Sequence, residues 1–139
     1  ITDFLDRTMS TLDFSDMQLR ELPDLSEFTD LNRLSANNCG LTTLPTRNQL
    51  PNNIEVMSLV NNQLTEAPLD GWGTLTNLFV ANLGKNPWER INVNIFRELF
   101  NEKLARLVLD VDLENLTPEN RKEYEALLSD ADEQGYMIQ

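Results

Sequence analysis

Residues 31–45 read LNRLSANNCGLTTLP and residues 54–68 read IEVMSLVNNQLTEAP. Both stretches have apolar residues at positions one, four, six, eleven and fourteen, asparagine or cysteine at position nine, and proline at position fifteen. Most of the same spacing recurs from Met9 to Pro23 and from Leu78 to Ile91, so that the four copies begin 22, 23 and 24 residues apart. Agreement over so many positions indicates an internal repeat.

The spacing has a physical reading. Positions four and six lie on one face of a short strand, because side chains alternate between the two faces of a strand. The residue at position nine turns the chain, and its side chain bonds backbone groups that would otherwise be buried without partners. Since one copy cannot bury its own apolar face, the copies are expected to stack as a curved solenoid with a parallel sheet inside.

The pattern L-x-x-L-x-L-x-x-(N/C)-x-L resembles that of leucine-rich-repeat proteins over residues 9–91. The resemblance implies an α/β fold: a short right-handed horseshoe arc with a parallel sheet on its concave face and a helical C-terminal cap. Cys39 stands at the asparagine position and is expected to be a buried turn residue rather than a reactive thiol. Met17 departs from the pattern at this position, which predicts a looser first turn.

The two ends of the chain lack the repeat and are predicted to cap it, which makes residues 1–139 a single domain. Residues 1–8 form the N-terminal cap, with Phe4 and Leu5 covering the first coil and a short helix starting near Thr2 and Asp3. Residues 92–139 are predicted to form a helix, a strand and a second helix. The signals, in order, are a helical stripe from Ile95 to Leu104 with Asn94 as its N-cap, alternation from Leu107 to Leu113, and the helix start Thr117-Pro118-Glu119.

Composition excludes several functions. The chain has no histidine, one cysteine and a net charge of −12, which argues against imidazole-based catalysis, disulfide scaffolds and binding to nucleic acid or anionic membranes. The acids lie mostly in the first 30 and last 30 residues, where they would keep the chain monomeric. With a single cysteine and no leader peptide in the chain, a cytoplasmic location is favoured.

Two acidic stretches resemble calcium loops, but neither is complete. Asn115 replaces the turn glycine after Asp110-x-Asp112-x-Glu114, and Asp130-x-Asp132-x-Gln134-Gly135 stops short of the twelfth loop position. We therefore expect no metal, no cofactor and no catalysis.

The segment from Leu50 to Pro68 is also similar to repeats of secreted bacterial effectors, in some of which an Asn-Pro pair and a helix lead to a ubiquitin-ligase domain. Asn86-Pro87 is similar to that junction, although the repeats here are longer and no catalytic Cys-x-Asp occurs. An alternative function is therefore substrate recognition or autoinhibition within a larger enzyme. A third is a purely structural array that self-associates.

The main functional hypothesis is binding of another protein through the concave face. In the repeat architecture the variable strand residues point to that face, where Val56, Val60 and Val80 form an apolar streak. The predicted partner-binding residues are Asp13, Ser15, Arg33, Ser35, Asn37, Glu55, Val56, Ser58, Val60, Val80 and Asn82.

Overall fold

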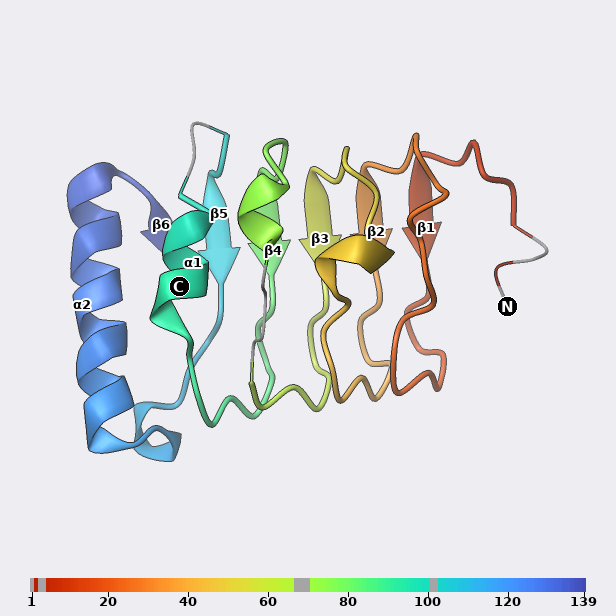
Figure 1. Ribbon diagram of the computed structural model, residues 1–139. Coiled ribbons are helices and arrows are strands. Elements are labelled where there is room, and N and C mark those ends of the chain that lie inside the picture. The colour runs from red at the N-terminus through yellow and green to blue at the C-terminus, as the bar shows by residue number, and fades with distance from the viewer. Residues whose placement is uncertain (1, 3–4, 67–70, 101–102) are drawn as a thin grey trace.

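A computed structural model describes residues 2, 5–66, 71–100 and 103–139 (Figure 1). Within these ranges the fold is α/β, with one parallel sheet whose strands follow the order of the sequence from β1 to β6. The strands are β1 (Thr11–Asp13), β2 (Arg33–Ser35), β3 (Val56–Ser58), β4 (Val80–Asn82), β5 (Arg106–Val108) and β6 (Met137–Ile138).

The register of the sheet aligns the repeat copies position by position. Leu12 pairs with Leu34, Leu34 with Met57, Met57 with Ala81, and Ala81 with Leu107. These central residues are all buried, as the strand alternation predicts. Each parallel neighbour requires a crossover, and here every coil of about one repeat provides it, which gives a solenoid-like arrangement.

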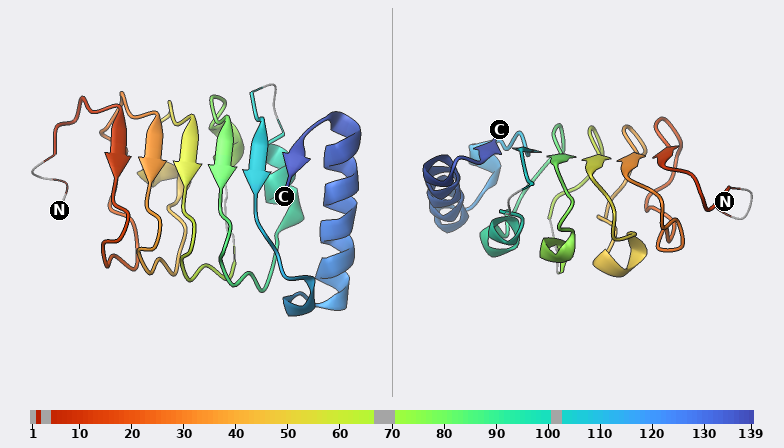
Figure 2. Two further views of the ribbon diagram at one scale, coloured as in Figure 1. Left: turned by 180° about the vertical axis from the view of Figure 1, so that it is seen from behind. Right: turned by 90° about the horizontal axis from the view of Figure 1, so that it is seen from above.

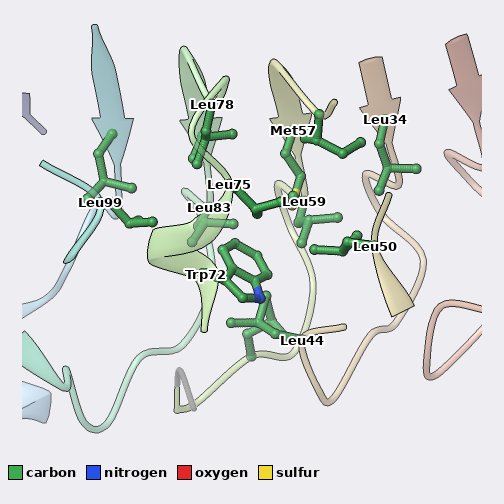
Figure 3. Packing of buried hydrophobic residues seen from close by; sticks show 14 of the residues in the cluster. Leu34, Leu44, Leu50, Met57, Leu59, Trp72, Leu75, Leu78, Leu83 and Leu99 are labelled. Carbon is green, nitrogen blue, oxygen red and sulfur yellow. The ribbon is translucent and has the colours of Figure 1, made fainter. Parts of the chain in front are cut away.

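The crossovers cover one face of the sheet with short helices: η2 (Arg47–Gln49), η3 (Trp72–Thr74) and α1 (Val93–Glu98). Apolar side chains of the crossovers pack with the strand residues in one core (Figure 3). Trp72 is fully buried between Leu44 and Leu59, and its indole Nε1 donates to the Pro45 carbonyl at 3.2 Å. Each coil needs only a short strand to fill the hydrophobic core, because the crossovers supply most of the apolar side chains.

A ladder of side-chain amides runs through the core beside the turns. Asn62 Oδ1 accepts from the backbone N–H groups of Cys39 and Leu41 at 2.9 and 3.1 Å, and its Nδ2 donates to carbonyls of its own and the preceding coil. Asn86 repeats these contacts one coil later. Cys39, at the same position, uses its thiol to donate to the Phe14 carbonyl at 3.1 Å.

The first turn keeps the backbone conformation of the others. Asp16, Asn38, Asn61 and Lys85 each precede position nine, and all have a positive φ. Met17 supplies no amide there and is 39% exposed. In the later coils, the N–H at the position equivalent to Leu19 donates to an asparagine side-chain oxygen. Leu19 N–H donates instead to the Cys39 carbonyl at 2.9 Å.

Trp88 continues the ladder after its last asparagine. Its Nε1 donates to the carbonyls of Leu83 and Leu109, at 3.2 and 3.0 Å, which are the acceptors that an asparagine of the fifth coil would reach. The residue at that position, Asp112, instead caps a short helix, η4 (Leu113–Asn115). Asn120 then holds the backbone of Ile91 through both its amide oxygen and its amide nitrogen.

The C-terminal cap confirms some predictions and corrects others. Helix α2 (Pro118–Gln134) starts at the predicted N-cap Thr117 and ends at Gly135, whose φ is 83°. Helix α1 starts after Asn92 rather than after the predicted N-cap Asn94, the Asn92 side chain makes no capping hydrogen bond, and the helix stops before Leu104. The predicted strand ends at Val108, because the chain turns at Asp110 with a φ of 55°. After Gly135 the chain returns to the sheet as β6, which the helix–strand–helix prediction lacked.

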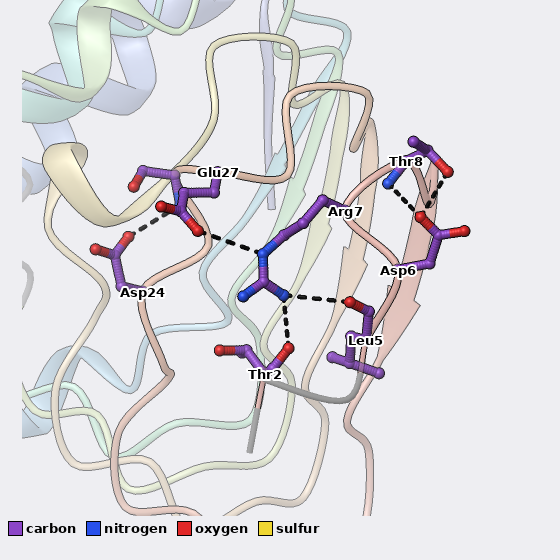
Figure 4. Close-up of polar contacts among 8 residues, drawn as sticks. Thr2, Leu5, Asp6, Arg7, Thr8, Asp24 and Glu27 are labelled. Atoms are coloured by element: carbon purple, nitrogen blue, oxygen red, sulfur yellow. Dashed lines mark hydrogen bonds and ion pairs between the residues drawn. The ribbon is translucent and has the colours of Figure 1, made fainter.

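The N-terminal segment is held by Arg7 (Figure 4). Its guanidinium donates to the Thr2 carbonyl at 2.5 Å and to Glu27 at 3.3 Å, and it lies 4.6 Å from the centre of the Phe28 ring. Leu5 packs against the core as predicted. The predicted helix near Thr2 and Asp3, and the contact of Phe4, depend on residues 3 and 4, which lie outside the described ranges.

Candidate binding face

One face of the sheet is not covered by the crossover helices. Seen from behind, the strands lie in front of the short helices, with α2 at one end of the row (Figure 2). We call this surface the open face. It is formed by the outward side chains of β1 to β6 and of the second residue after each of β1 to β4.

Register fixes these side chains in rows that cross the strands. The first row is Thr11, Arg33, Val56, Val80, Arg106 and Met137, and the second is Asp13, Ser35, Ser58, Asn82 and Val108. The third is Ser15, Asn37, Val60 and Gly84, placed by the backbone bonds Asp16 N to Asn37 O, Asn38 N to Val60 O and Asn61 N to Gly84 O. Ten of the eleven predicted binding residues therefore share one surface.

Glu55 is the exception among the predicted residues. It precedes β3 and lies at the margin of the open face, between Asn32 and Phe79 in the line of backbone hydrogen bonds. Its side chain is exposed. Glu55 can therefore contact only a partner that extends beyond the strand rows.

The half of the open face nearest the N-terminus is polar and internally hydrogen-bonded. Asn37 Oδ1 accepts from Ser58 Oγ and Val60 N, both at 2.8 Å, while Asn37 N donates to Ser15 Oγ at 3.1 Å. Asp13 Oδ1 accepts from Ser15 N at 2.9 Å, and hydrogen bonds from Ser15 lower the pKa of the Asp13 carboxyl. These side chains are positioned before any partner arrives.

The other half of the open face is more apolar than the sequence indicated. Val56, Val60, Val80 and Val108 are half-buried, and Phe79 and Met137 are 51% and 52% exposed. Gly84 allows close packing here, since a Cβ at this position would lie 3.3 Å from Val108 Cγ1 and 3.2 Å from Asn82 Oδ1. This half of the open face therefore carries several apolar side chains over β3 to β6, with Ser58, Asn82 and Arg106 between them.

Four residues of the open face and its margin were missed from the sequence. Val108 shares its side of the predicted Leu107–Leu113 strand with Asp110 and Asp112, and Arg106 precedes that stretch. Phe79 directly precedes the predicted Val80 and could have been found by extending each copy by one position. Met137 carried no signal, because a two-residue strand is too short to show alternation.

Both arginines of the first row lack an acidic partner among the described residues. Arg33 is exposed and makes no side-chain hydrogen bond or ion pair there, and Arg106 Nε donates to Gln139 Oε1 at 2.7 Å. The ion pairs in the described part of the chain join Arg7 to Glu27 and Arg97 to Asp130. The open face therefore presents cations on an otherwise acidic chain.

Other parts of the described chain offer little chemistry. No group of three or more histidine, cysteine, aspartate or glutamate residues gathers to hold a metal within the described ranges. Asp130, Asp132 and Gln134 belong to α2 rather than to a loop, and Asp130 pairs with Arg97 at 2.7 Å. Burial raises the pKa of the Cys39 thiol, which disfavours the reactive thiolate.

Comparison with known proteins adds no assignment. No family model matches the chain, and no curated protein matches it either. Within the described residues, no helix has both the length and the apolar character required to cross a membrane.

Proposed function

We propose that this chain is a leucine-rich-repeat solenoid that binds another protein through the open face of its sheet, which corresponds to the concave face of the repeat family. The repeat spacing, the position-by-position register and the amide ladder all support this assignment. We assign the chain no catalysis of its own. The groups with a raised pKa, Cys39 and Tyr124, are buried away from the open face.

One observation carries the proposal: three half-buried β-branched side chains, Val56, Val60 and Val80, gather on the open face, and no helix of the described chain covers them (Figure 2). Val56 and Val80 pair in register on β3 and β4, while Val60 lies two residues after β3. Hydrogen bonds to Asn37 fix the backbone of Val60 and the side chain of Ser58 beside them. Contiguous apolar groups exposed to water mark interaction sites. A pre-organised surface also reduces the entropy lost on binding.

Electrostatics favour a protein over a nucleic acid as the partner. With a net charge of −12, the chain repels phosphate backbones, whose binding depends on many basic contacts. An apolar area bordered by hydrogen-bonding groups has the composition of protein interfaces.

The test replaces Val56, Val60 and Val80 by aspartate and compares the proteins captured from lysate with those captured by the unmodified chain. A matched control replaces Thr43, Gln63 and Thr76 by aspartate, because these exposed residues lie outside the strand rows. Circular dichroism and thermal unfolding check that both variants fold. We expect the valine variant alone to lose its partner; identical capture by all three proteins would refute the proposal.

A further inference from the structure

The first row of the open face places two apolar side chains between two cationic ones. Arg33 pairs in register with Val56, Val56 with Val80, and Val80 with Arg106. Two cations therefore flank two valines on four adjacent strands. Because parallel strands lie about 4.8 Å apart, the two arginine Cα atoms are separated by three spacings, or about 14 Å.

The acids around this row leave the two arginines unneutralised. Asp13 is turned to Ser15, to which it is hydrogen-bonded at 2.9 Å. Glu55 and Asp110 are exposed and lie at opposite margins of the sheet, before β3 and after β5, and neither forms an ion pair within the described residues. A ligand that crosses the strands along the first row would thus meet positive charge at both ends and apolar surface between them.

This spacing matches that of an extended peptide. Residues i, i+2 and i+4 of an extended chain point to the same side, and residues i and i+4 lie about 13 Å apart. Carboxylates at i and i+4 would reach the two guanidinium groups, with which carboxylates form strong paired hydrogen bonds. The side chain at i+2 would rest on Val56 and Val80.

We propose that the open face recognises an extended acidic–x–apolar–x–acidic segment of a partner protein, lying across strands β2 to β5. The inference rests on the proposed function and names the chemistry of its partner. Electrostatic complementarity of this kind selects one partner and one orientation more than it adds affinity.

The probe is a synthetic peptide, acetyl-Ser-Glu-Ser-Val-Ser-Glu-Ser-amide, titrated into the isotopically labelled chain while valine methyl resonances are followed by NMR. We expect saturable shifts at Val56 and Val80. Two control peptides carry glutamine in place of both glutamates or place the second glutamate at i+3. Each exposed ion pair contributes up to about 1 kcal/mol, so the i+3 peptide, which loses one pair, should bind up to about fivefold more weakly. The glutamine peptide loses both pairs and should bind up to about 30-fold more weakly.

Variants of the chain locate the contacts. Arg33→Gln and Arg106→Gln should each weaken binding of the glutamate peptide by about fivefold at low salt, with no change for the glutamine peptide. Arg90→Gln is the matched control, because Arg90 is exposed and lies outside the strand rows, and it should leave binding unchanged. Shifts that are absent, or equal for all three peptides, would overturn the inference.

Failure of this inference can be separated from failure of the proposed function. If captured partners are lost in the valine-to-aspartate variant but kept by Arg33→Gln and Arg106→Gln, the open face binds proteins of another chemistry and the inference is wrong. If both sets of variants keep their partners, the proposed function itself is wrong.

Discussion

The two faces of the sheet are built from the same short strands, yet they are subject to different constraints. Facing the crossovers, Leu34, Met57, Ala81 and Leu107 are no more than 1% exposed. On the open face, their direct neighbours include arginine, serine, valine and asparagine, half-buried or exposed. Packing therefore restricts the inner residues to apolar side chains, whereas the outer ones are left free to be selected for binding. The predictions below test this contrast, from the largest expected effect to the smallest.

Replacing Leu59 by alanine should cost about 2–5 kcal/mol of unfolding free energy, because it leaves a cavity in a packed core. Val60→Ala, one residue further on the open face, should cost at most about 1 kcal/mol, because its side chain is only half-buried and each fully buried methyl group contributes about 0.8 kcal/mol. Urea unfolding of the two variants measures the difference. Similar losses would show that the inward and outward positions are not distinguished as described.

The amide ladder gives a second pair of neighbours. Asn62→Ala leaves the N–H groups of Cys39 and Leu41 without their acceptor, and since each such buried group costs at least about 1 kcal/mol, we expect a total loss of at least about 2 kcal/mol. Asn61→Gly is the control. Asn61 is exposed with a φ of 58°, which glycine adopts readily, so this change should cost under about 1 kcal/mol. Equal midpoints in chemical denaturation would contradict the structural role of the ladder.

The buried face of α2 predicts a pH dependence. Burial, with a smaller contribution from the charge of Asp110, raises the pKa of Tyr124 from 10.0 to about 12. The neutral phenol is thus favoured by folding, so its contribution is fully present below pH 10 and is lost as the pH rises toward 12. The loss should reach about 2–3 kcal/mol. Unfolding at pH 9 and pH 12 should show this dependence in the unmodified chain and less of it in Tyr124→Phe.

Trp88→Phe tests the end of the ladder with the smallest change. It removes the indole N–H shared by the Leu83 and Leu109 carbonyls, and we expect a loss of about 1–3 kcal/mol. Trp72→Phe, which removes a single bond to Pro45, should cost less. The reverse order of thermal midpoints would mean that Trp88 only fills space.

Much of the fold could be predicted from the sequence, because burial and turns leave local signatures. The spacing of Leu31, Leu34 and Cys39 against Ile54, Met57 and Asn62 placed the strands, and the Thr117-Pro118-Glu119 signal placed the start of α2. Prediction failed for elements whose position depends on contacts between distant parts of the chain. Helix α1 begins after Asn92 and β6 forms only because β5 offers it an edge, and neither fact has a local pattern.

The candidate site, like the fold, could be predicted from the sequence only in part. Its position on the outward strand residues followed from the repeat period alone, since alternation assigns every second side chain to one face. Its composition did not, because Arg106, Val108 and Met137 enter the open face only when distant segments pair in register. Thus the sequence by itself determined which residues are buried and at what period the chain turns. Only the tertiary structure decided which side chains stand next to each other on the open face, since adjacency across strands depends on hydrogen-bond register rather than on any local preference.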